Sequence, residues 1–200
     1  MLLLVNWIKR QEVEDVYLEF IKRTYISKFD VDESNQAIAE KIWKSGAFTI
    51  KSPDIFGIAL LDDIVNPCEA IRESAAEAIS NFLEEIKSSN SFKKPQTLQV
   101  IISGLLTKIS LLFEENSFMI MPVYDDFGRL VSEGGVDKWE ARSGLALTLR
   151  KLCPYLPNSL LQNYFNIILP KGINDRSPNV SHLMLLAAVE GVKIHGKVSR

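Results

Sequence analysis

Three side chains in the C-terminal third of the chain have the chemistry of a nucleophile and a base. Cysteine and histidine can act together in covalent catalysis, which draws attention to Cys153, His182 and His195. Cys153 lies at the end of a predicted helix, before Pro154, and the histidines fall near opposite ends of another helix. No acidic residue stands at a recognisable spacing to orient a histidine. The pattern therefore argues against an enzyme, and only turnover abolished by Cys153→Ala would revive that interpretation.

The cysteines and the N-terminus indicate neither a metal site nor a membrane segment. Cys68 and Cys153 lie too far apart for a metal-ligand motif and form no disulfide framework, as is typical of the reducing cytosol. The apolar run Met1–Val5 ends too soon for a signal peptide or a membrane span, and we interpret it as the end of an earlier helix. The sequence predicts no cofactor, no small-molecule substrate and no membrane contact.

Positive charge is concentrated in the C-terminal third. Residues 1–137 carry 14 basic and 22 acidic side chains, whereas residues 138–200 carry 9 and 3. Solvated helix faces commonly drift in sign without a binding role, and contact with phosphate groups is the alternative interpretation of this excess. The candidate contacts with nucleic-acid phosphates are Arg150, Lys151, Lys171, Arg176, Lys193 and Lys197.

Stripes of apolar residues at i, i+3, i+4 and i+7 predict a series of helices that would position these groups. In the second helix we expect Asp32 or Ser34 as the N-cap, with Ile38 and Ile42 facing inward. No strand-like alternation competes with the helical pattern. The predicted helices span residues 13–21, 32–43, 53–65, 71–86, 95–113, 139–152, 160–169 and 180–196.

The helical periodicity lapses over residues 116–137. Pro122, Gly128, Gly134 and Gly135 indicate a connection of about twenty residues, and loops of that length are usually functional or disordered. We therefore divide the chain into helical hairpins over 1–115, the connection over 116–137, and further hairpins over 138–200, with the array truncated at its C-terminus.

Three of the predicted helices begin alike, at positions 71–72, 141–142 and 180–181. The last two starts are 39 positions apart, close to the HEAT period of about 40–47 residues, whereas the long connection separates the first two by 70. The repeat predicts an all-α fold, a HEAT or armadillo-type solenoid of stacked antiparallel helical hairpins. The structural residues of the repeat are Ile71, Arg72, Ala75, Trp139, Arg142, Gly144, Asp175 and Val180.

Two roles are expected within this repeat. Asp137 with Arg142, and Asp175 with Arg176, are predicted to form a ladder between successive hairpins. As surface ion pairs they would each contribute about 1 kcal/mol or less, so their value would lie in fixing the register. Trp139 is interpreted as a packed residue at a helix start rather than a platform for stacking bases.

Several strings of the sequence go beyond a generic repeat. Residues 137–147 read DKWEARSGLAL, residues 172–180 read GINDRSPNV and residues 195–197 read HGK, while residues 126–132 read DFGRLVS. Over residues 45–197 the chain resembles the general control nonderepressible family of translational activators. The match is specific in the block 137–197. Ser181 departs from it, because the family favours arginine there, and we expect a weaker ladder at the last hairpin.

The resemblance implies a function as well as a fold. The family consists of very large cytoplasmic HEAT-repeat proteins that bind ribosomes and activate the amino-acid-starvation kinase of initiation factor two alpha. It implies a non-catalytic scaffold segment, with the ribosome, that kinase and flanking HEAT repeats as partners. The family's proteins are far longer than this chain, so it is expected to be an internal fragment or a truncated gene product, and the family's kinase-binding region has no match among its residues. A generic protein-binding HEAT module of a transport or assembly factor, without ribosome contact, stays open as the alternative.

Overall fold

The structure is a computed structural model that describes residues 14–46, 48–88 and 95–196. The predicted helices are present, with ends that differ by a few residues. The interpretation of Met1–Val5 and the candidate Lys197 lie outside the described residues. The helices are α2 Glu14–Ser27, α3 Glu33–Gly46, α4 Pro53–Leu60, α5 Glu69–Ser88, α6 Pro95–Ser117, α7 Trp139–Leu152, α8 Leu161–Ile167 and α9 Pro178–His195.

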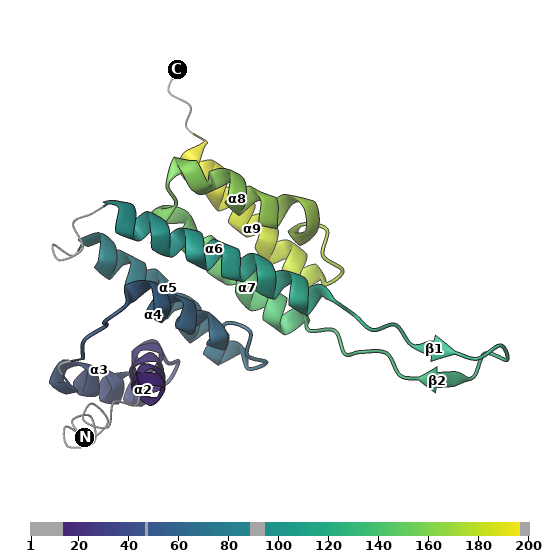
Figure 1. The fold of residues 1–200 in the computed structure, drawn as a ribbon, viewed down its shortest axis with the longest axis horizontal. Coiled ribbons are helices and arrows are strands. Elements are labelled where there is room, and N and C mark those ends of the chain that lie inside the picture. The colour runs from purple at the N-terminus through teal and green to yellow at the C-terminus, as the bar shows by residue number, and fades with distance from the viewer. Residues whose placement is uncertain (1–13, 47, 89–94, 197–200) are drawn as a thin grey trace.

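The helices from α4 onward form two stacked layers (Figure 1). Helices α5, α7 and α9 lie side by side in one layer, and α4, α6 and α8 lie side by side in the other. Consecutive helices pair across the layers, α4 with α5 and α6 with α7, while α8 reaches α9 through the π-helical turn Ile168–Gly172. At the N-terminal end α2 packs on α3, α4 and α5. This is the stacking of helical hairpins in a HEAT-type solenoid, so the predicted fold class is confirmed.

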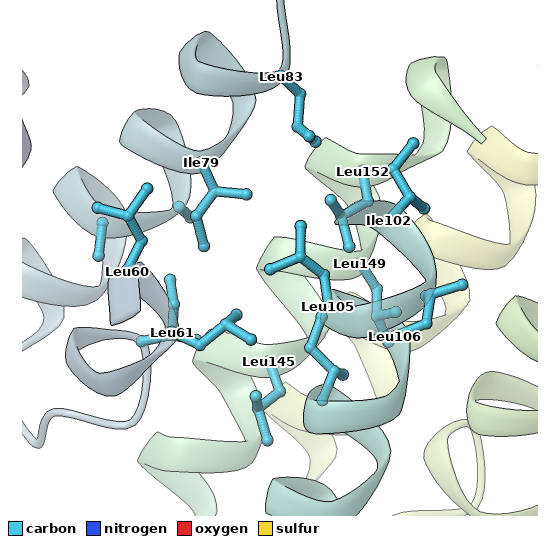
Figure 2. Close-up of a cluster of buried hydrophobic side chains, with 14 of the residues drawn as sticks. Leu60, Leu61, Ile79, Leu83, Ile102, Leu105, Leu106, Leu145, Leu149 and Leu152 are labelled. Atoms are coloured by element: carbon cyan, nitrogen blue, oxygen red, sulfur yellow. The ribbon is translucent and has the colours of Figure 1, made fainter. Parts of the chain in front are cut away.

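One apolar core runs through the stack without a break between hairpins. Ala75, Ala76 and Ala78 are fully buried on α5, where small side chains let neighbouring helices approach closely. Figure 2 shows leucine and isoleucine side chains of α4, α5, α6, α7 and the 3-10 turn after α4 converging at the centre. The labelled ones are Leu60, Leu61, Ile79, Leu83, Ile102, Leu105, Leu106, Leu145, Leu149 and Leu152.

Helix α6 combines unusual length with a largely apolar composition. Over Thr97–Ser117 it is long and apolar enough to cross a membrane by length and composition alone. In the fold it packs against α4, α7 and α8, and Ile102, Leu105 and Ile109 are fully buried. Its composition is therefore explained by its place between two hairpins.

Helix α3 is rotated relative to the predicted orientation. Asp32 caps it, because its Oδ1 accepts a hydrogen bond of 2.8 Å from the backbone N–H of Ser34. The prediction that Ile38 faces inward is wrong, since 58% of this residue is exposed. Ala39 and Trp43 face the core instead, because the Trp43 ring packs against Tyr25 of α2 at 4.9 Å between centroids.

The connection between α6 and α7 contains two strands that the sequence did not predict. Strands β1, Val123–Tyr124, and β2, Leu130–Ser132, pair antiparallel with an irregular register. At the tip, Gly128 has a φ of 74°, a left-handed conformation that favours glycine. Figure 1 shows this hairpin projecting far from the helical stack. We call residues 118–136 the β-arm.

Gly144 lies where α7 approaches Ile64, in the turn before α5, and Arg72 of α5, and it gives the first prediction. A Cβ there would overlap the backbone oxygen of Ile64 and lie 2.9 Å from Cδ of Arg72. Gly144→Ala is therefore expected to lower the free energy of unfolding by about 2 kcal/mol or more, measured by urea denaturation.

Gly104→Ala is the matched control, because a Cβ on this α6 glycine meets nothing closer than Ile58 Cδ1 at 3.7 Å. Alanine also favours helix, so this variant is expected to be as stable as the parent or up to about 1 kcal/mol more stable. Equal stability of the two variants would contradict the proposed close approach.

Candidate functional site

The side chain of Arg142 is the centre of the site. It projects from the first turn of α7 and is fully buried. Nε and Nη2 donate to the two carboxylate oxygens of Asp175, at 2.8 and 2.9 Å. Nη1 and Nη2 donate to the two oxygens of Asp137, at 2.7 and 3.3 Å, and Nη1 also donates to the Asn116 carbonyl at 2.8 Å. All five guanidinium donors are thereby satisfied, which is what burial of this group requires.

Arg176 is a second arginine at the same site. Its Nη2 donates to Asp137 Oδ1 at 2.5 Å, and its Nη1 donates to the Ser117 carbonyl at 3.0 Å. The predicted pair of Asp137 with Arg142 is present, whereas Asp175 binds Arg142 rather than the predicted Arg176. The prediction of weak surface pairs is also wrong for Arg142, which has no exposed surface. We call Arg142, Arg176, Asp137 and Asp175 the arginine clamp.

The clamp holds the base of the β-arm. Asn116 and Ser117 lie where the chain leaves α6, and Asp137 lies where it returns to α7. Farther along the arm, the Gly135 N–H donates to the Ile120 carbonyl at 2.8 Å. The two legs of the arm are therefore fixed to each other and to the turn that precedes α9.

The electrostatics of the clamp favour the charged forms of both Asp137 and Arg142. Hydrogen bonds from Arg142 and Arg176 hold the pKa of Asp137 well below its usual range. Burial opposes the charge of Arg142, but the hydrogen bonds with Asp175 and Asp137 outweigh it and raise the pKa of Arg142 above its ordinary value. The site is therefore an ion network at neutral pH.

The positions equivalent to Arg142 also bind the turns that precede their helices. Arg72 on α5 is buried and donates through Nη1 to the carbonyls of Asn66 and Pro67, at 2.9 and 2.7 Å. Ser181 on α9 donates through Oγ to the Ile173 carbonyl at 2.6 Å. Serine reaches a backbone oxygen instead of a carboxylate, so this hairpin lacks the charged pair that arginine makes at position 142.

The remaining repeat residues have packing roles. Ala75 and Val180 are fully buried on α5 and α9, and Ile71 is half-buried. Trp139 is half-buried and packs against the core at the start of α7. These positions match the packing roles expected from the sequence.

The five candidate RNA contacts that the structure describes do not form one unpaired basic surface. Lys151 forms an ion pair with Glu77, Lys171 pairs with Glu114 at 3.0 Å, and Arg176 belongs to the clamp. Arg150 and Lys193 are exposed. The first three cations are therefore partly neutralised by carboxylates of neighbouring hairpins.

The residues considered for catalysis do not form a nucleophilic site. His195 Nε2 lies 3.0 Å from the backbone oxygen of Cys153, so the imidazole meets the main chain of that residue. Burial raises the pKa of the Cys153 thiol, which opposes formation of the reactive thiolate. His182 is exposed on the first turns of α9, at the opposite end of the helix from His195.

The apolar surface of the β-arm is a feature that the sequence did not reveal. Phe127 and Val136 are 82% and 88% exposed. Monomeric soluble proteins rarely expose contiguous apolar patches, and larger ones mark interaction sites. The sequence indicates this surface only through the many apolar residues of the long connection, which it does not show to be exposed. The exposed apolar residues of the arm are Phe118, Ile120, Met121, Val123, Tyr124, Phe127, Leu130, Val131 and Val136.

Stacked helical hairpins whose turns are joined by a buried arginine define a segment of a HEAT-repeat solenoid. The family model described as the HEAT repeats of the stalled ribosome sensor GCN1 matches residues 11–199. The chain belongs to this family, and the resemblance found in the sequence is confirmed.

Individual relatives agree with this assignment. The chain is 34% identical over 180 residues to the human "Stalled ribosome sensor GCN1" and 33% identical to the mouse protein of that name. It is 26% identical over 188 residues to the "eIF-2-alpha kinase activator GCN1" of Saccharomyces cerevisiae. Each match covers 90% of this chain but 6% of the relative. No solved structure matches.

Replacement of Arg142 tests the clamp. Arg142→Met keeps the aliphatic stem but leaves Asp137 and Asp175 without their buried partner, so the free energy of unfolding is expected to fall by about 3–5 kcal/mol. Urea denaturation measures the change. Arg150→Met, an exposed position on the same helix, is the control and should stay within about 0.5 kcal/mol of the parent. A loss in Arg142→Met no larger than in the control would contradict the clamp.

Acid is expected to weaken the clamp. The pKa of Asp137 is lower in the folded chain than its ordinary value of 3.8, so its contribution to stability is complete above that value and disappears as the pH falls further. Thermal unfolding between pH 6 and pH 2 should show the melting temperature falling most steeply below about pH 4. Asp137→Asn should have a shallower acid slope. An identical slope in both proteins would rule out Asp137 as a source of the acid sensitivity.

Proposed function

We propose that this chain is a non-catalytic HEAT-repeat scaffold segment of a ribosome-associated translational regulator that activates the amino-acid-starvation kinase. The observation that carries the proposal is the family match over residues 11–199, supported by relatives named as a stalled ribosome sensor and a kinase activator. A role at the ribosome places the protein in the cytoplasm.

This chain corresponds to 6% of each relative, so we do not assign the activity of the whole protein to it. The role that we propose for the segment is structural contact. Kinase activation belongs to the longer protein, and we assign no residue here to kinase binding. Flanking HEAT repeats are further partners. On α9, Leu185, Val189 and Val192 are exposed at the i, i+4 and i+7 spacing of one helix face, which suits stacking by another helical hairpin.

The basic residues of the C-terminal third supply the ribosome contact in this proposal. Arg150 and Lys193 are exposed, and Lys171 remains 63% exposed despite its pair with Glu114. Phosphate contacts of this kind are independent of base sequence and weaken as salt displaces them. Neutralisation by neighbouring carboxylates limits the number of such contacts.

Ribosome co-sedimentation across a salt series tests the proposal. The triple variant Arg150→Glu, Lys151→Glu and Lys171→Glu is expected to bind at least about tenfold more weakly than the parent at low salt, with a shallower salt dependence. Lys44→Glu, on α3 in the acidic part of the chain and 77% exposed, is the matched control and should bind like the parent. If neither salt nor the triple substitution alters binding, the basic residues are not the contact.

A generic protein-binding module remains the second candidate, favoured by the exposed apolar β-arm and by the carboxylate partners of Lys151 and Lys171. Affinity purification separates the two. Recovery of ribosomal proteins supports the ribosome-associated scaffold, whereas recovery of a cargo or assembly factor alone supports the alternative.

A further inference from the structure

The β-arm has the surface of a protein-binding element. All five residues of strands β1 and β2 are exposed, and four of them are apolar. Arg129 stacks over the Phe127 ring at 5.3 Å and leaves that ring 82% exposed. An aromatic ring with so much accessible surface is the type of side chain that anchors protein interfaces.

The backbone of the arm is also open to a partner. In the described part of the chain the sheet consists of β1 and β2 alone, so each strand has one outer edge without a neighbouring strand. Two-stranded ribbons are marginally stable in water, and open edges accept a further strand through main-chain hydrogen bonds. An extended peptide would therefore gain backbone pairing as well as apolar contact.

The arginine clamp orients the arm before any partner arrives. Arg142 and Arg176 bind the carbonyls of Asn116 and Ser117 on the outgoing leg and the carboxylate of Asp137 on the return leg. The direction of the arm is thus tied to the helical stack. Fixing a binding element in advance reduces the entropy that association must overcome.

Charge selects the kind of partner. The β-arm carries three acidic residues, Asp125, Asp126 and Glu133, and one basic residue, Arg129. An acidic surface repels the phosphates of RNA and attracts basic peptide segments. The charge of the arm is opposite in sign to that of the C-terminal third, so the two surfaces suit different ligands.

We propose that the β-arm binds an extended, positively charged protein segment on the ribosome, which adds as a strand to an open edge of the arm. The inference rests on the proposed function, since it names the ribosome as the particle contacted. In this inference the β-arm binds a protein, whereas the basic residues outside the arm bind RNA.

Site-specific crosslinking of the 200-residue chain to purified eukaryotic ribosomes tests this contact. Phe127 is replaced by the photoreactive residue p-benzoylphenylalanine, and the crosslinked product is treated with ribonuclease or protease. The expected product is a ribonuclease-resistant adduct with a ribosomal protein, whose crosslinked peptide is rich in lysine or arginine.

Affinity for the same ribosomes is measured in parallel. Phe127→Asp is expected to weaken binding at least about tenfold, because it removes an aromatic anchor and adds a charge. Val100→Asp is the matched control, since Val100 is 62% exposed on α6 and lies outside the arm, and it should bind like the parent. Both positions are on the surface, and circular dichroism of each variant is the check that its helices remain intact.

The outcomes separate the two proposals. An adduct with RNA or with a second copy of the chain, or unchanged affinity of Phe127→Asp, overturns the assignment of the arm while ribosome binding by the parent upholds the scaffold. If the parent chain does not sediment with ribosomes, both proposals fail.

Discussion

The buried guanidinium of Arg142 is the interaction on which the C-terminal half of the molecule depends. A buried arginine is tolerated only when its charge and all its donors find partners, and here those partners come from three separate segments, represented by Asn116, Asp137 and Asp175. The end of α6, the start of α7 and the turn before α9 must therefore adopt one relative arrangement. The apolar core supplies the bulk of the stability, whereas this network specifies how successive hairpins are placed.

The sequence was informative where chemistry is local and periodic. Apolar periodicity located the helices, and the shared helix starts revealed the stacking of α5, α7 and α9. The partners of Arg142 were only half predicted, because Asp137 is close in sequence whereas the pairing of Asp175 with Arg142 rather than with Arg176 depends on how two turns meet in space. For α3, Ile38 suggested the inward face, but the ring contact between Trp43 and Tyr25 decides its rotation.

The β-arm shows a different limit of sequence reasoning. Strands of two and three residues are too short to give an alternating pattern, and here apolar residues lie on exposed surface instead of in a core. The usual inference from hydrophobicity to burial therefore fails. Pro122 and Gly128 signalled an interruption of the helices but not the projecting hairpin seen in Figure 1. Packing within this chain does not explain the apolar residues of this segment.

The open edges of the β-arm also bear on solubility. A strand edge lined by exposed apolar residues is a template for aggregation, since one chain can extend the sheet of another. Asp125, Asp126 and Glu133 place like charges on every arm, and charged residues beside apolar strands act as gatekeepers against such growth. Neutralising these acidic residues would remove the repulsion between arms without disturbing the helical core. The acidic residues therefore oppose aggregation of chains whose arm has no bound partner.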